Sequence, residues 1–405
     1  MALYFGIKMT IKELGISILS LICLVSAAPF YFWGWGGYLL LLCIGFLTII
    51  GLSRAINHDL KLKVSIIYGG FFLCLISYTY LTLSGLSVGA IFISFLILII
   101  YSVDDCSIEK IFLNFKKIIS FILFPAIVLW FIHVMLSNNT FLNLGQIRSD
   151  FVPNQHKVDI GLYYYYYPFM TIVDYDVPSS FYRFPGPFDE PGVVGTLASL
   201  ILCADKFSLK GKMNKTVFLS GLISFSLVFY ITCFIYFSLT FHKEIKRNIV
   251  YLLVLISLIF LVINNSFIGS YFNRLIIDRL VFTNGKIAGD NRATVGLENR
   301  FNEWMSSYDL QTIFFGFKSV DLEGSSSIKQ VFLTTGLVGF ALFTAILMMI
   351  FFRRFRGEFN IYVLSFLLIF GLSLYQRPDI SALYILLIFS FGILHLSSIS
   401  RFKRL

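Results

Sequence analysis

The sequence predicts an all-α fold: a polytopic integral membrane bundle of about 12 transmembrane helices with two long periplasmic loops. Three observations predict it. Hydrophobic residues make up 58% of the chain and charged residues only 13%, whereas soluble domains are about a quarter charged. Apolar runs long enough to cross a bilayer recur along the chain. The lysines and arginines gather in short segments between these runs, as the positive-inside bias expects of cytoplasmic loops.

The first part of the chain contains five predicted spans followed by a long loop. Lys8 and Lys12 precede the first span, which places the N-terminus in the cytoplasm. A second apolar run follows directly without a small-residue cleavage site, so we expect a span and not a signal peptide. The fifth span delivers the first periplasmic loop, 138–188, to the outer face. The five spans are predicted at 13–33, 36–54, 64–83, 85–102 and 117–137.

The sixth span begins at Pro191, and the apolar run after it, 216–241, decides the topology of everything downstream. A single crossing would invert every later loop against the charge bias. A double crossing places the second periplasmic loop, 267–327, outside and the C-terminus in the cytoplasm. Because the run is short for two crossings, we expect two short helices or a re-entrant hairpin, broken near Ser224 and Ser226.

Composition excludes several other classes of protein. The net charge of +10 could indicate nucleic-acid binding, but the basic residues lie in loops and no nucleic-acid-binding pattern accompanies them. All six cysteines lie in predicted spans or at cytoplasmic edges, which disfavours a disulfide framework and a zinc site. We see no internal repeat and no linker, so we expect one transmembrane domain over residues 1–405 and no cofactor.

The segment 181–195 concentrates ionisable residues on a Pro/Gly turn before an apolar helix. Pro191 suits the first position of that helix. Asp189 and Glu190 either cap the helix or supply the base that deprotonates a sugar hydroxyl, and the sequence leaves both interpretations open. Arg183 has a guanidinium that matches phosphate geometry bidentately, so we expect it to bind a substrate phosphate.

Other residues of the first loop are weaker candidates. The unbroken run from Tyr163 to Tyr167 is typical of a membrane-interface belt, and sugar stacking is the alternative. Asp174 and Asp176 form an Asp-x-Asp match that is too short to indicate a metal site, so none is expected. His156 is a minor candidate for acid–base work.

The second loop supplies further candidates for binding substrate. Arg292 and Arg300 are its substrate-binding cations, while Arg300, Glu303 and Trp304 share one face of a predicted helix. A local Arg–Glu pair beside a tryptophan packed at the membrane surface is the alternative to a role for Arg300 and Trp304 in binding. Arg377, in the short outer turn after the eleventh span, is another candidate cation.

Several of these motifs recur together in a known order. Residues 183–191 read Arg-Phe-x-Gly-x-Phe-x-Glu-Pro, and Arg300-x-x-x-Trp304, Phe315-Gly316-Phe317 and Gly336-x-x-Gly339 follow. Over roughly residues 117–345 this order resembles the superfamily of Wzy-type polymerases and O-antigen ligases. The ligases typically carry a histidine eleven residues before the first glycine of the last motif. Here that position is Ser325, which favours a polymerase.

The resemblance implies a bacterial inner-membrane glycosyltransferase that polymerises undecaprenyl-pyrophosphate-linked oligosaccharides by inverting transfer at the periplasmic face. Arginines would then meet the charge on the leaving pyrophosphate. Membrane lipids surround the enzyme, a polysaccharide chain-length regulator is a candidate partner, and no nucleic acid is expected. The alternatives are an O-antigen ligase and a lipid-linked oligosaccharide flippase. Transporters tend to carry ionisable residues at mid-membrane, and the predicted spans here are almost free of them.

Overall fold

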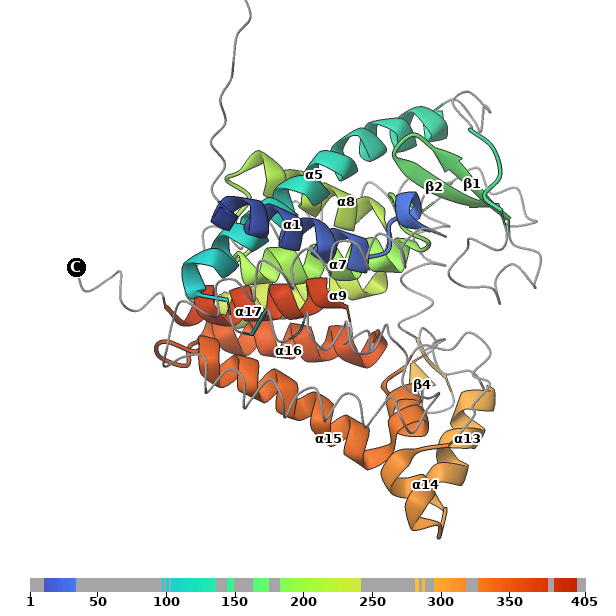
Figure 1. Ribbon diagram of the computed structural model, residues 1–405. Helices are drawn as coiled ribbons and strands as arrows, with labels where there is room; N and C mark the ends of the chain where they lie inside the picture. Colours follow the sequence, from blue (N-terminus) through green and yellow to red (C-terminus); the bar gives the residue numbers. More distant parts are fainter. Residues whose placement is uncertain are drawn as a thin grey trace, which may run out of the picture.

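The computed structural model is mostly helical, as the sequence predicts (Figure 1). Two helices, α5 (Asp105–Met135) and α15 (Ile328–Arg354), are long and apolar enough to cross a membrane, by length and composition. The structure describes residues 11–33, 97, 100–101, 103–135, 144–148, 163–174, 183–241, 281–283, 286–287, 295–317, 327–377 and 382–398. The predicted spans at 36–54 and 64–83 lie outside these residues, so the count of 12 spans stays a prediction.

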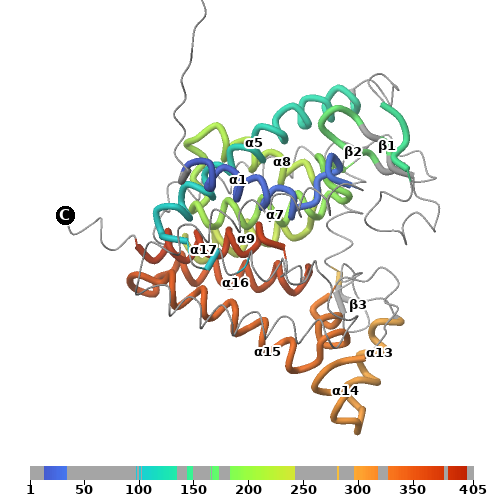
Figure 2. Tube along the Cα trace, viewed as in Figure 1, coloured from blue at the N-terminus to red at the C-terminus, as the bar shows by residue number. Residues whose placement is uncertain are grey.

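Shorter helices and two strand hairpins complete the described part of the chain. The helices are α1 (Ile11–Ser26), the 3-10 helix η1 (Phe30–Phe32), α7 (Pro191–Ala204), α8 (Lys212–Ile223), α9 (Leu227–Thr240), α13 (Val295–Met305), α14 (Leu310–Phe315), α16 (Ile361–Gln376) and α17 (Leu383–Ser397). The strands are β1 (Tyr163–Tyr167), β2 (Met170–Asp174), β3 (Phe282–Thr283) and β4 (Lys286–Ile287). Figure 2 shows the helices of the bundle side by side, with α13, α14 and the β1–β2 hairpin at one end.

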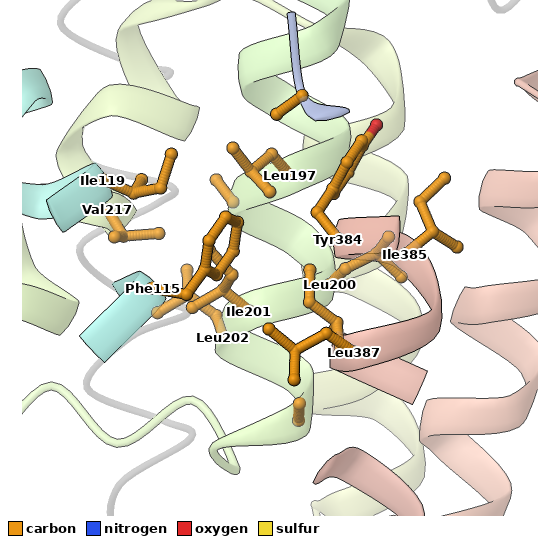
Figure 3. Packing of buried hydrophobic residues seen from close by; sticks show 14 of the residues in the cluster. Phe115, Ile119, Leu197, Leu200, Ile201, Leu202, Val217, Tyr384, Ile385 and Leu387 are labelled. Atoms are coloured by element: carbon orange, nitrogen blue, oxygen red, sulfur yellow. The ribbon is translucent and has the colours of Figure 1, made fainter. Parts of the chain in front are cut away.

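Helix α7 lies at the centre of the bundle and packs against α8, α9, α16 and α17. Every residue from Val194 to Ala204 is buried, as expected of a helix that is apolar all round and enclosed by others. Figure 3 shows its leucines meeting Phe115 and Ile119 of α5, Val217 of α8 and Tyr384 of α17. We call the two ends of this bundle the Pro191 end and the Asp205 end, after the residues that flank α7.

Helices α8 and α9 form an antiparallel hairpin along α7. Asn214, near the start of α8, donates a hydrogen bond to Asp205 at 2.6 Å, and Phe207 contacts the ring of Tyr236 near the end of α9. The connection between the two helices lies instead beside Gly195, in the first turns of α7. The sequence predicted a break near Ser224 and Ser226, and the structure confirms it, because α8 ends at Ile223 and α9 begins at Leu227.

Helix α5 begins earlier than the predicted fifth span. The sequence placed that span at 117–137, whereas the helix begins at Asp105, so Lys116 lies on the helix and not in a loop. Asp104 explains the early start, since its carboxylate accepts hydrogen bonds from the backbone N–H and the hydroxyl of Ser107, as an N-cap does. Lys116 is buried and paired with Asp205 at 2.7 Å, which ties α5 to the turn after α7.

The described parts of the two long loops contain regular structure, of which the sequence pattern predicted only the helix that carries Arg300, Glu303 and Trp304. The tyrosine run is strand β1, which pairs antiparallel with β2 in the register Tyr163↔Asp174 to Tyr167↔Met170. The second loop contains the strand pair β3–β4 and the helices α13 and α14, which pack against the start of α15.

Candidate functional site

The turn at residues 183–190 is a buried junction and not an exposed loop. Phe184 and Phe188 are almost fully buried, and Phe184 packs edge-on against Trp130 of α5 at 6.2 Å between ring centroids. Gly186 adopts φ 55°, a left-handed conformation that favours glycine. A Cβ added there would also approach Leu123 of α5 to 3.2 Å. The Pro/Gly composition therefore serves a tight turn inside the protein.

Neighbouring elements bind three consecutive carbonyl groups of this turn. The backbone N–H of Thr171 in β2 donates to Gly186 at 2.9 Å, and its hydroxyl donates to Phe188 at 2.5 Å. Between them, the N–H of Phe30 in η1 donates to Pro187 at 2.7 Å. Buried backbone groups are costly unless they are hydrogen-bonded, so these contacts hold the turn in one conformation.

Arg183 binds the end of α8. Its Nε donates to the carbonyl oxygen of Ser224 at 3.2 Å and its Nη2 to that of Phe225 at 3.0 Å. The last carbonyls of a helix have no partner within the helix, and they carry partial negative charge. The Arg183 guanidinium supplies both a hydrogen-bond donor and a positive charge to these carbonyls, at the point where the chain breaks between α8 and α9.

Two further donors complete the set at this break. The N–H of Phe184 donates to the carbonyl oxygen of Ile223 at 3.3 Å, and the hydroxyl of Tyr230 donates to that of Leu222 at 2.8 Å. Four consecutive carbonyls, from Leu222 to Phe225, therefore receive hydrogen bonds from outside α8. The residues that the sequence singled out as a substrate-binding turn thus hold the α8–α9 hairpin in place.

Gly195 brings α7 against the same break. A Cβ added at Gly195 would overlap the side chain of Ser226 and would lie 3.3 Å from the hydroxyl of Ser224. The two segments approach this closely because glycine has no side chain.

Glu190 and Arg377 form an ion pair at the Pro191 end. The Nη2 of Arg377 donates to the Oε2 of Glu190, and the two side chains are only 11% and 21% exposed. Arg377 follows α16, where its own N–H donates to Ser373 at 2.8 Å. The pair joins residues 187 positions apart in the sequence.

This pairing corrects the capping hypothesis for Glu190. Glu190 does occupy the N-cap position of α7, with extended backbone angles of φ −144° and ψ 143°. Among the described residues, however, its carboxylate accepts no capping hydrogen bond from the first turn of that helix and binds Arg377 instead. Asp189, the preceding residue, is partly buried at the same end of the bundle.

We group four ionisable residues of the Pro191 end as one cluster: Arg183 and Arg377 supply two guanidinium groups, and Asp189 and Glu190 supply two carboxyl groups. With both carboxyls ionised, the formal charge of these four side chains is zero. Among the residues the structure describes, no group of three or more His, Cys, Asp or Glu side chains could hold a metal ion. Asp176 and His156 lie outside the described residues.

The second-loop candidates lie apart from this cluster. Arg300 pairs with Glu303 at 2.9 Å on an exposed face of α13, the local pair that its spacing predicts. Trp304 is buried with Leu297 and Leu333, and its Nε1 donates to the carbonyl oxygen of Thr312 at 3.0 Å. Trp304 therefore packs α13 against α14 and α15. Arg292 lies outside the described residues, and Tyr163 is the first residue of β1.

The glycines of the later motifs mark a close contact between backbones. Gly316 and Gly336 have φ angles of 79° and 65°. A Cβ at Gly316 would lie 2.6 Å from the carbonyl oxygen of Leu333, and one at Gly336 would overlap the backbone of Phe314. The N–H of Phe317 donates to Leu333 at 2.8 Å. The end of α14 is thereby seated in a kink of α15.

Sequence reasoning missed Thr171 and Tyr230, which hold the turn and the helix break. Tyr230 is one of several hydroxyl residues in α9, Thr171 lies in a short strand, and neither position carries a local signal of its distant partner. No protein-family model, curated protein or solved structure matches this chain.

Proposed function

We propose that this protein is a membrane-embedded glycosyltransferase of the polymerase type, acting on polyprenyl-pyrophosphate-linked oligosaccharides at the outer face of the bacterial cytoplasmic membrane. One observation carries the proposal: the Glu190–Arg377 ion pair assembles at one end of an apolar bundle, from residues 187 positions apart. Ionisable side chains that are largely buried in a membrane bundle are paired and typically mark function, and this pair is largely buried.

The distribution of basic residues supports the orientation. Lys206 lies over the ring of Tyr362 at the Asp205 end, and the backbone N–H of Arg356 donates to the hydroxyl of Ser397 at the same end of the bundle. Arg354, at the end of α15, pairs with Asp105. By the positive-inside bias the Asp205 end faces the cytoplasm, which places the Glu190–Arg377 pair on the periplasmic side. Reporter fusions after Asn248 should then report cytoplasm and fusions at residue 285 periplasm, and an inverted pattern would reject the 12-span arrangement.

The chemistry requires two tasks that this cluster is suited to perform. A hydroxyl oxygen of one repeat attacks the anomeric carbon of the donor, the bond from that carbon to the pyrophosphate oxygen breaks, and the pyrophosphate leaves with the electron pair. Arg377 stabilises the charge that develops on the leaving group, because a guanidinium fits phosphate oxygens. Glu190 or Asp189 accepts the proton of the attacking hydroxyl.

Glu190 and Arg377 also depend on one another. The carboxylate fixes the guanidinium, and the guanidinium stabilises the carboxylate in the ionised form that a base needs. A pyrophosphate that draws Arg377 toward itself would loosen this ion pair and make Glu190 a better proton acceptor. The Glu190–Arg377 ion pair therefore links stabilisation of the leaving group to acceptance of the proton.

The test measures single-turnover polymerisation of lipid-linked repeats by purified Arg377→Ala, Arg377→Lys and Glu190→Gln variants. We expect Arg377→Ala to slow the reaction by roughly 30- to 1000-fold, the loss of about 2–4 kcal/mol expected for one preorganised charge contact. Arg377→Lys should recover little, since it lacks the planar fork. The matched control is Arg148→Ala, an exposed arginine of the first loop.

Two outcomes would reject the proposal. Near-normal rates for Arg377→Ala and Glu190→Gln at normal membrane abundance would remove the ion pair from the chemistry. Movement of intact lipid-linked repeats across vesicle bilayers, with no polymer formed, would favour the flippase alternative.

A further inference from the structure

Four large apolar side chains are exposed together around the connection between α13 and α14. Met305 is 65% exposed, Tyr308 100%, Leu310 67% and Phe314 43%. We call these four residues the apolar tip. Scattered apolar residues on a surface need no explanation, but four within ten positions on one small unit form a patch.

The apolar tip is held rigidly on α15. Trp304 is buried between α13 and α15, and the Gly316 and Gly336 backbones exclude any side chain between α14 and the kink of α15. Asp309 lies between Tyr308 and Leu310 of the tip. Its carboxylate accepts hydrogen bonds from the N–H groups of Gln311 and Thr312, both at 3.1 Å, and from the Thr312 hydroxyl. Its carboxylate is thus satisfied within the protein.

The length of α15 sets the height of the tip relative to a membrane. The 18 residues from 337 to 354 follow the kink and measure about 27 Å at 1.5 Å per residue, close to the roughly 30 Å of a bilayer hydrocarbon core. With Arg353 and Arg354 at one boundary, Gly336 reaches the other. Phe314, whose backbone contacts Gly336, then lies at the level of the lipid headgroups.

The apolar tip also lies to the side of the bundle. Figures 1 and 2 show α13 and α14 beyond the start of α15 and on the side away from α16 and α17. The exposed residues Leu337, Met348 and Phe352 continue an apolar surface along α15 itself. If α15 crosses the bilayer, a unit in this position lies over the lipid beside α15.

We propose that the apolar tip inserts into the outer leaflet at the boundary between headgroups and acyl chains, and anchors α13 and α14 to the lipid surface. Tyrosine, methionine, leucine and phenylalanine are suited to this boundary, where an apolar body and a polar end both find partners. The inference rests on the part of the proposed function that places α15 in the bilayer. It does not depend on the glycosyl transfer.

The experiment uses the full-length protein in vesicles of phosphatidylethanolamine and phosphatidylglycerol. The photoreactive p-benzoylphenylalanine replaces Tyr308 in the test variant, the exposed Asn299 of α13 in the control, and the exposed Phe352 of α15 in a reference variant. After irradiation, mass spectrometry measures the lipid adducts. We expect adducts at positions 308 and 352, with several-fold fewer at position 299.

Each remaining outcome rejects a defined part of the inference. Adducts at 352 with none at 308, or a 308 variant that cross-links to a second copy of the chain, would overturn lipid anchoring while leaving α15 in the bilayer. Equal adducts at 299 and 308 would show nonspecific contact and would also overturn it. Absence of adducts at 352 would reject the membrane span on which the proposed function depends.

Discussion

The guanidinium of Arg183 donates a hydrogen bond to the carbonyl oxygen of Ser224 at 3.2 Å, across 41 positions of sequence. The contact joins the turn before α7 to the break between α8 and α9. It also assigns Arg183 a structural task that its sequence motif alone did not reveal, since the motif favoured a substrate phosphate.

Arg183→Ala should therefore destabilise the protein. Removing the side chain leaves the carbonyls of Ser224 and Phe225 without their charged donor, and hydrogen bonds to charged groups contribute about 1.5–3 kcal/mol each. We expect a lower unfolding temperature in detergent and reduced abundance in membranes, with Arg148→Ala as the control. Unchanged stability together with lost polymerisation would instead assign Arg183 to the substrate.

Gly195→Ala should weaken the packing of α7 against the break by about 1–3 kcal/mol, because the added methyl group overlaps Ser226. Since the overlap is with the Cβ of Ser226, Ser226→Ala should not relieve it, whereas Ser226→Gly should. A double-mutant cycle of unfolding free energies checks this coupling. Additive effects of Gly195→Ala and Ser226→Gly would contradict the contact.

Gly336→Ala should release α14 from α15. The new Cβ meets backbone atoms, which cannot rotate away, and the residue must also keep a left-handed φ that costs about 1–2 kcal/mol. We expect faster proteolysis near Tyr308. The control is Gly371→Ala in α16, where no described atom lies within 4 Å of the added Cβ, and a glycine-to-alanine change in a helix adds up to about 1 kcal/mol of stability. Equal protease resistance in both variants would contradict the backbone contact.

The stability of the contact between α14 and α15 should also depend on pH, through the carboxyl group of Asp309. Hydrogen bonds from Thr312 and Gln311 lower the pKa of this exposed carboxyl below its ordinary value of 3.8. A group with a depressed folded-state pKa stabilises the fold above the unfolded value, and the effect is lost as pH falls through the folded value. Protease resistance near Tyr308 should thus be constant from pH 7 to about 4 and decline below 3.8. Asp309→Asn should remove this pH dependence. If protease resistance instead declines at a higher pH, another titratable group causes the decline.

Local patterns predicted the helical class, the start of α7 at Pro191 and the break near Ser224. Each follows from composition, from proline chemistry or from the length of an apolar run, all of which act over a few residues. The tyrosine run was harder, because β1 depends on pairing with β2, and aromatic residues suit both strands and membrane interfaces.

Which side chains the candidate site residues contact could not be predicted from local patterns. Glu190 stands where a capping residue belongs, yet its carboxylate binds Arg377 from α16, and no local signal distinguishes the two arrangements. Trp304 shares a helical face with Arg300, but burial against α15 separates their environments. Such choices are made by tertiary contacts between segments far apart in the chain.

The two hydrogen bonds of Thr171 make the alignment of the β1–β2 hairpin a condition for the geometry of the site. Side chains of a strand alternate between its faces, so a slip of one residue would turn the Thr171 hydroxyl away from Phe188 and bring Met170 or Ile172 into its place. Neither of these residues has a side-chain donor for the Phe188 carbonyl, which would then lie buried without its partner, one residue before Asp189. Changes in hairpin length that preserve the alignment should therefore be tolerated, whereas those that shift it by one residue should disturb Glu190 and Arg377 without touching either.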